Sequence, residues 1–125
     1  MNIKTKTISL YFMSGFYVIA GINHFVNPQF YYPLIPDYLP YHSLLNILSG
    51  FAEIILGLLL LLVTTRKLAS YGIIAMLILF IPAHIHLIDM GGCIDLGLCV
   101  PLWVAWVRLV PLQLLLMYWA WWHRK

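Results

Sequence analysis

Four long apolar segments restrict the fold of this chain more than any other feature. Each holds about 19 to 25 residues, and a helix that rises about 1.5 Å per residue needs about 20 to cross a hydrocarbon core of about 30 Å. Because no water reaches backbone groups in that core, each crossing segment must be helical. The segments are Ile8–Val26, Leu44–Val63, Leu68–Ile88 and Leu98–Trp122. The sequence therefore predicts a single all-α domain over residues 1–125, a bundle of four transmembrane helices.

The composition agrees with a membrane protein and excludes most other classes. Of the 125 residues, 63% are hydrophobic and 9% are charged, and the mean hydropathy is +0.93, whereas soluble domains carry about 25% charged residues. The net charge is +3, but the basic residues stand singly or in pairs at segment edges. Nucleic-acid binding needs them clustered on a solvated face with aromatic side chains. We therefore expect a lipid bilayer and no nucleic acid.

The basic residues at the segment ends predict the orientation. They are Lys4, Lys6, Arg66, Lys67, Arg124 and Lys125. The connections 27–42 and 89–97 contain no Lys or Arg. Since short cytoplasmic loops are enriched in Lys and Arg, both termini are predicted to be cytoplasmic. The alternative interpretation, a cleavable signal peptide ending near Ala20, would leave three segments.

The two predicted outer connections differ in character. Residues 27–42 hold four prolines and five aromatic residues, which interrupt a long helix and favour the headgroup layer. This Pro- and aromatic-rich loop between the first two helices is predicted to lie along the outer interface, either as a lid or as a packing loop without a ligand. The other connection contains Cys93 and Cys99, which could form a disulfide on an oxidising face or remain thiols in a reducing compartment.

Two charged residues lie in the middle of predicted helices. Glu53 is nine residues and Arg108 ten from the outer ends of their segments, a depth of about 13 to 15 Å. Charges inside a membrane are costly and are normally paired. The sequence thus predicts a Glu53–Arg108 ion pair, which either fixes the helix packing as a structural pair or leaves Arg108 to bind an anionic or carbonyl ligand.

Histidines occur near the outer ends of the first and third segments. His24, His84 and His86 could ligate a metal or donate hydrogen bonds to a quinone carbonyl. Residues two apart on a helix point about 200° from each other, so His84 and His86 cannot both face inward unless Pro82 distorts the helix. We therefore predict no metal site.

Several sequence blocks, taken together, have the pattern of one group of small membrane proteins. They are Ala20–Phe25 with Pro28, Phe30–Tyr31 and Pro36–Pro40, then Ser49–Glu53 with Gly57, Phe80–Ile85, and Arg108–Gln113 with Trp119. The set resembles the DoxX-like family, which includes DoxD and MauE. Two positions depart from that pattern, because His84 stands where Asn is common and Val110 lengthens the Arg-Leu-Pro block by one residue.

The resemblance implies a four-helix protein of the bacterial inner membrane. DoxD-type proteins are membrane subunits of a thiosulfate:quinone oxidoreductase, and MauE-type proteins assist maturation of a periplasmic amine dehydrogenase. By position, the resemblance also implies that Gln113 joins Glu53 and Arg108 as an intramembrane polar residue.

These observations lead to two functional hypotheses. The first is a quinone- or small-ligand-binding accessory subunit of an electron-transfer system, not a complete enzyme, that works with a redox partner subunit. The second is a membrane assembly factor in which the Glu53–Arg108 pair is structural and the aromatic loop meets a periplasmic client. Either protein could form a homo-oligomer. The candidate ligand residues are His24, Glu53, His84 and Arg108, with Asn23, Ser49, His86 and Gln113 as secondary candidates.

Overall fold

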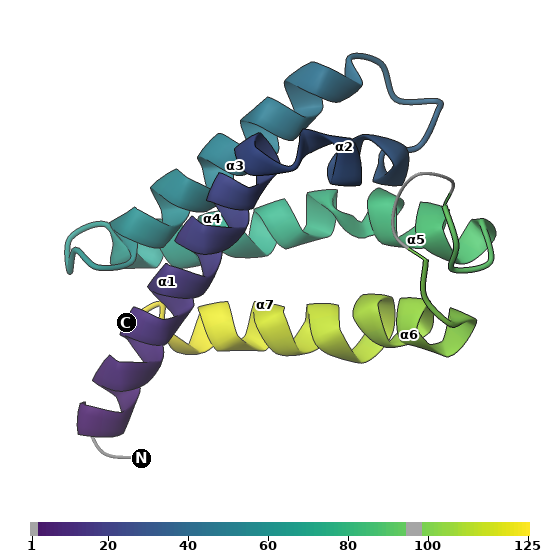
Figure 1. Cartoon of the computed structure of the whole chain (residues 1–125). Coiled ribbons are helices and arrows are strands. Elements are labelled where there is room, and N and C mark those ends of the chain that lie inside the picture. Colours follow the sequence, from purple (N-terminus) through teal and green to yellow (C-terminus); the bar gives the residue numbers. More distant parts are fainter. Residues whose placement is uncertain (1–2, 95–98) are drawn as a thin grey trace.

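The computed structural model describes residues 3–94 and 99–125, and these ranges contain helices and no named strand (Figure 1). The stretches long and apolar enough to cross a membrane are Ile3–Val26, His42–Leu59, Val63–Asp89 and Leu102–Trp122. The prediction of an all-α protein with four helices of membrane-spanning length is confirmed. Leu98, where the fourth segment was predicted to begin, lies outside the described residues.

The helices follow one another along the chain with short connections. They are α1 (Ile3–Val26), α2 (Pro28–Tyr31), the 3₁₀ turn η1 (Tyr32–Leu34), α3 (His42–Leu59), α4 (Arg66–Leu79), α5 (Ile81–Asp89), α6 (Leu102–Val107), the π-helical turn η2 (Arg108–Leu112) and α7 (Gln113–Trp122). In Figure 1, the marked N and C ends lie toward the same side as the α3–α4 connection. The α5–α6 connection lies on the opposite side.

Helices α1 and α3 pack closely against each other, because glycines face each other across their contact. A Cβ atom on Gly21 would lie 2.6 Å from the backbone oxygen of Gly50. One further contact ties the pair, since the Ser14 hydroxyl donates a 2.7 Å hydrogen bond to the Gly57 carbonyl. Small residues allow this backbone approach in membrane helices, and the approach brings the polar faces of α1 and α3 together.

The second pair consists of α4 and α7, and α4 also packs on α3. The buried core between the two pairs contains Leu10, Met13, Tyr17, Leu60, Ala69, Ile73, Met76, Leu77 and Ala120. Helix α1 reaches α7 at one end, where the Trp119 indole donates a 2.8 Å hydrogen bond to the Ser9 hydroxyl. Farther along, α1 diverges from α6 (Figure 1), and in the described residues no Cα of α1 lies within 8 Å of one in α6 or η2.

Two of the membrane-length stretches are interrupted. Helix α4 ends at Leu79 and α5 begins at Ile81, and Pro82 explains this break because it has no N–H for the preceding turn. The fourth stretch contains η2, whose Pro111 has no backbone N–H to donate a helical hydrogen bond. Wider π-helical turns of this kind are frequent at functional sites. The interruptions lie within one turn of His84 and Arg108, which places both residues where helical geometry is least regular.

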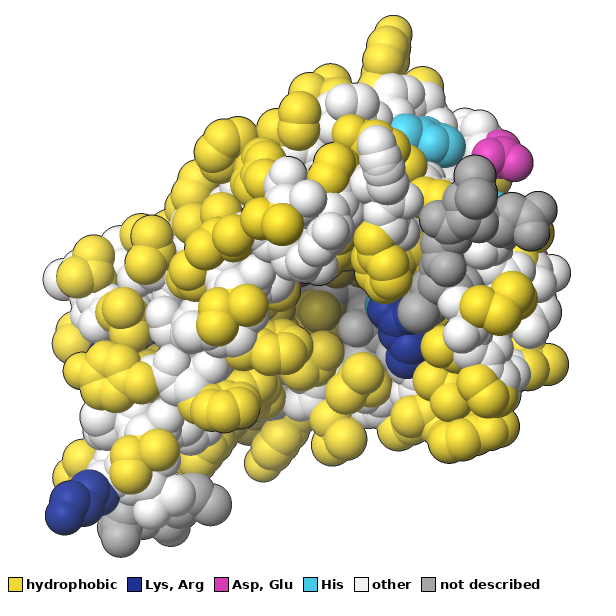
Figure 2. All heavy atoms as spheres, viewed as in Figure 1, with side chains coloured by type: hydrophobic (Ala, Val, Ile, Leu, Met, Phe, Trp, Pro, Cys, Tyr) yellow, Lys and Arg dark blue, Asp and Glu magenta, His cyan; other side chains and the backbone are white. Residues whose placement is uncertain are grey.

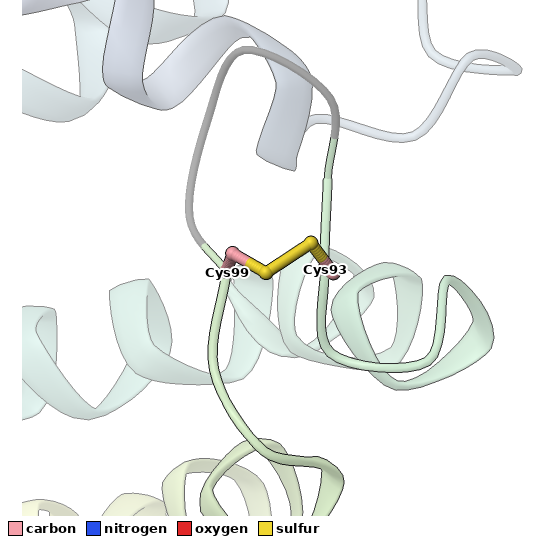
Figure 3. Close-up of a disulfide and its surroundings, with 2 residues drawn as sticks. All are labelled: Cys93 and Cys99. Carbon is pink, nitrogen blue, oxygen red and sulfur yellow. A yellow bond between two sulfur atoms is a disulfide. The ribbon is translucent and has the colours of Figure 1, made fainter.

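The predicted outer connections are folded against this end of the bundle. The first contains α2 and η1, each with a proline in its first turn, where the missing N–H costs least. Its Leu34 is buried, whereas Tyr38 and Tyr41 are each 76% exposed. In the second connection Cys93 and Cys99 are joined by a disulfide (Figure 3). The Val100 N–H donates to the Gly92 carbonyl just outside this bridge.

Candidate functional site

A cavity of about 200 Å³ lies where α1, α3, α5 and η2 come together. Its polar walls are formed by His24 of α1, Asn46, Ser49 and Glu53 of α3, His84 of α5, Arg108 of η2 and Tyr31 of α2. Figure 2 shows the molecule hollowed on one face between α1 and α6, with a dark blue basic side chain at the edge of the hollow. The four candidate ligand residues, His24, Glu53, His84 and Arg108, therefore line one cavity; that they bind a ligand stays a prediction.

Asn46 fixes the orientation and protonation of the His24 ring. The Asn46 amide nitrogen donates a 2.9 Å hydrogen bond to the His24 carbonyl, so its oxygen faces His24 Nδ1 at 2.7 Å. An amide oxygen only accepts, and His24 Nδ1 must therefore carry a proton and donate. The other ring nitrogen, Nε2, is left to face Glu53.

The side chains of His24 and Glu53 meet between α1 and α3. His24 Nε2 lies 3.3 Å from Glu53 Oε2, and both side chains are buried. With no proton between them, a nitrogen lone pair would face a carboxylate, which is repulsive. The contact is favourable when His24 is an imidazolium or when Glu53 is protonated. A carboxylate has two oxygens that can each accept more than one hydrogen bond, so Glu53 retains capacity to accept from a ligand.

Tyr31 covers the His24 side of the cavity. Its ring stacks on the His24 ring, with centroids 3.8 Å apart and an interplanar angle of 18°. The Asn23 amide donates a 2.6 Å hydrogen bond to the Tyr31 hydroxyl. Burial, with a smaller contribution from Glu53, raises the pKa of Tyr31 above its usual value of 10.0, so the phenol is neutral at physiological pH and can donate a hydrogen bond.

Arg108 does not form the predicted ion pair with Glu53. The acidic side chain pairs with His24 instead, and in the described residues Arg108 has neither an ion pair nor a side-chain hydrogen bond. The prediction failed because equal depth does not make two helices neighbours. Helix α3 packs on α1 and α4, whereas η2 packs on α5 and its own helix. Arg108 thus lines the same cavity as Glu53 without pairing with it.

The secondary candidates have different positions. Ser49 lines the cavity, but its hydroxyl donates to the Leu45 carbonyl. Gln113 is buried outside the cavity and donates a 2.9 Å hydrogen bond to the Leu77 carbonyl. Asn23 positions Tyr31 without lining the cavity, and His86 does not line it either.

Two wall residues were not among the candidate ligand residues. Asn46 lies seven positions before Glu53, and this spacing indicates that both share the interior face of one helix, but it does not distinguish a packing residue from a cavity residue. Tyr31 lies in a short helix within the Pro-rich connection, where no periodicity indicates which way a side chain points.

The described residues contain no group of three His, Cys, Asp or Glu side chains that could hold a metal ion. His84 lines the cavity while His86 does not, as expected for residues two apart on a helix. Arg108 offers hydrogen-bond donors at the cavity and Glu53 offers an acceptor.

Comparisons with known proteins correct the family assignment. Residues 13–124 match the family model described as "Domain of unknown function (DUF8561)". No curated protein and no solved structure matches the chain. The DoxX-like resemblance was wrong. Its blocks centre on glycines, prolines and polar residues, which close helix packing and helix breaks also favour in unrelated membrane proteins.

Proposed function

The chain belongs to DUF8561, a domain family of unknown function, and we propose that its cavity binds the headgroup of a quinone or a similar ring with carbonyl oxygens. The observation that carries this proposal is the Arg108 guanidinium, which has no ion-pair partner in the described residues and lines the same cavity as the Glu53 carboxylate. The protein would serve as an accessory membrane subunit that holds the ligand for an electron-transfer partner.

The size of the cavity supports a single ring. A protein cavity of about 150 Å³ binds one benzene molecule, and this cavity measures about 200 Å³. One six-membered ring with oxygen substituents therefore fits. Phe80, Leu87 and Leu34 supply apolar walls around the polar groups, an arrangement that is typical of small-molecule sites.

The polar groups suit both redox forms of such a ring. A quinone oxygen accepts hydrogen bonds, which Arg108 can donate. A quinol hydroxyl also donates, and the Glu53 carboxylate on the cavity wall can accept from it.

We place the cavity in the outer half of a bacterial inner membrane, with both termini in the cytoplasm. Lys and Arg residues at the ends of α1 and α7 and at the start of α4 support this orientation. The disulfide at the opposite end supports it independently, because disulfides persist in oxidising compartments.

Binding of a tailless quinone tests the proposal. We would titrate purified protein in detergent with 2,3-dimethoxy-5-methyl-1,4-benzoquinone and measure Kd by calorimetry. Removing a charged donor that contacts the ligand costs about 1.5 to 3 kcal/mol, a loss of roughly 10- to 100-fold in affinity. Arg108→Leu should show this loss, while the control Arg124→Leu should bind as the wild type does.

Thermal unfolding of both variants separates binding from folding. If Arg108→Leu keeps the wild-type melting temperature and binds equally well, Arg108 is not a ligand residue. If the wild type itself shows no saturable binding, the cavity does not serve this ligand class and the proposal fails.

One observation favours a second function, assembly of a secreted client protein. Tyr38 and Tyr41 are each 76% exposed on the connection between η1 and α3, and exposed tyrosines are frequent in protein interfaces. Photo-crosslinking residues placed at these two positions would capture a specific client in cells if this function is correct. Absence of a crosslinked protein alongside measured quinone binding would favour the first function.

A further inference from the structure

An apolar groove of about 610 Å³ runs between α3 and α4, beside the cavity. Leu45, Leu48 and Leu56 of α3 form one wall, and Gly72 and Ala75 of α4 contribute to the other. Lipid chains can cover any such surface in a membrane, so its apolar character alone does not identify an occupant.

The groove adjoins the cavity. The side chains that line both spaces are Ile35, Ser49, Phe80 and Ala83. A second apolar groove lies along α1, but it shares only Tyr31 with the cavity. The groove between α3 and α4 is therefore the more direct extension of the polar site.

The groove is elongated. It extends from Leu45 to Leu56, a length of about 16 Å at 1.5 Å per residue. Pro36 and Leu39 close one end. At the other end the Leu56 side chain lies 2.7 Å from where a Cβ on Gly72 would be.

We propose that this groove holds the apolar tail of the ligand whose headgroup occupies the cavity. The inference rests on the proposed function, and it assigns the ligand to the long-tailed membrane quinones and similar amphiphiles. The cavity has room for one ring, and the tail leaves past Ser49 and Ala83 to lie between α3 and α4, where its apolar surface meets leucine side chains.

Photolabelling tests this placement. The probe is a 1,4-benzoquinone with a straight alkyl chain that ends in a diazirine, added to the protein in detergent and irradiated. Both cysteines are joined in the disulfide, so the quinone meets no free thiol. Mass spectrometry should locate the label in peptides from α3 and α4, and excess tailless 2,3-dimethoxy-5-methyl-1,4-benzoquinone should abolish it.

Two substitutions of the same size provide the comparison. Ala75→Phe fills the groove and should reduce labelling at least tenfold, with the Kd for the tailless quinone unchanged. Ala20→Phe, in the groove along α1, should leave labelling unchanged.

Three other labelling results would overturn the placement of the tail. Label on α1, or label that the tailless quinone does not displace, would mean that the tail lies elsewhere or that bulk lipid fills the groove. No label despite binding of the tailless quinone would mean that something else, such as a second copy of the chain, covers it. All three overturn the inference but leave the proposed function intact, which fails only if the tailless quinone does not bind.

Discussion

Replacing Gly21 with alanine should force α1 away from α3 and disturb the cavity that the pair builds. The new Cβ atom would lie 2.6 Å from the Gly50 oxygen and 2.9 Å from the Ile54 nitrogen. Both are backbone atoms, so no side-chain rotation relieves the clash and the helices must separate. Overpacking of this kind costs about 1 to 3 kcal/mol, and we expect the upper end.

Gly15→Ala on the same helix is a matched control. A Cβ on Gly15 meets nothing within 4 Å. Both variants gain the helix propensity of alanine, about 1 kcal/mol, so the difference between their unfolding free energies isolates the clash. We expect Gly15→Ala to be slightly stabilised and Gly21→Ala to be less stable than it by about 1 to 3 kcal/mol.

The assay is unfolding in mild detergent, followed by circular dichroism with increasing denaturant. Gly21 is one helical turn from His24, so a wider helix contact should also weaken the 3.3 Å contact between His24 and Glu53. Quinone affinity should fall with stability. Equal stability of Gly21→Ala and Gly15→Ala would refute the close contact between α1 and α3.

Three further predictions concern other contacts. Asn46→Leu should destabilise the protein by about 1 to 3 kcal/mol in thermal unfolding, because it leaves buried groups of His24 without partners. Burial lowers the pKa of His123 from 6.5 to about 4, so between these two pH values the unfolded chain binds a proton that the folded chain does not. The free energy of unfolding should therefore fall as the pH drops from 6.5 to 4. His123→Gln should reduce this pH dependence in thermal melting curves. Replacing Cys93 and Cys99 by serine should lower the unfolding free energy by about 2 kcal/mol, from the loop-closure entropy of a six-residue separation.

The sequence predicts the helices well because the length of an apolar segment can be read directly along the chain. Runs of about 20 apolar residues are visible without knowing any neighbour. The gathering of His24, Glu53, His84 and Arg108 at one cavity also follows from depth and helical face, since buried polar groups in a membrane turn toward the interior.

The choice of partners depends on which helices are adjacent, and no periodicity reveals that. Glu53 and Arg108 have similar depth, yet the acidic side chain meets His24 because α3 packs on α1. Tyr31 could not be assigned for a related reason, because its direction is set by the short helix α2 and by the Asn23 hydrogen bond.

The most direct test of the central claim is the amount of native quinone that the protein retains. Wild type, Arg108→Leu and Arg124→Leu would be extracted in the same mild detergent, and quinone per chain would be measured by chromatography and mass spectrometry. The account predicts close to one quinone per chain in the wild type and in Arg124→Leu, and a large loss in Arg108→Leu. Equal, substoichiometric quinone in all three proteins would contradict it.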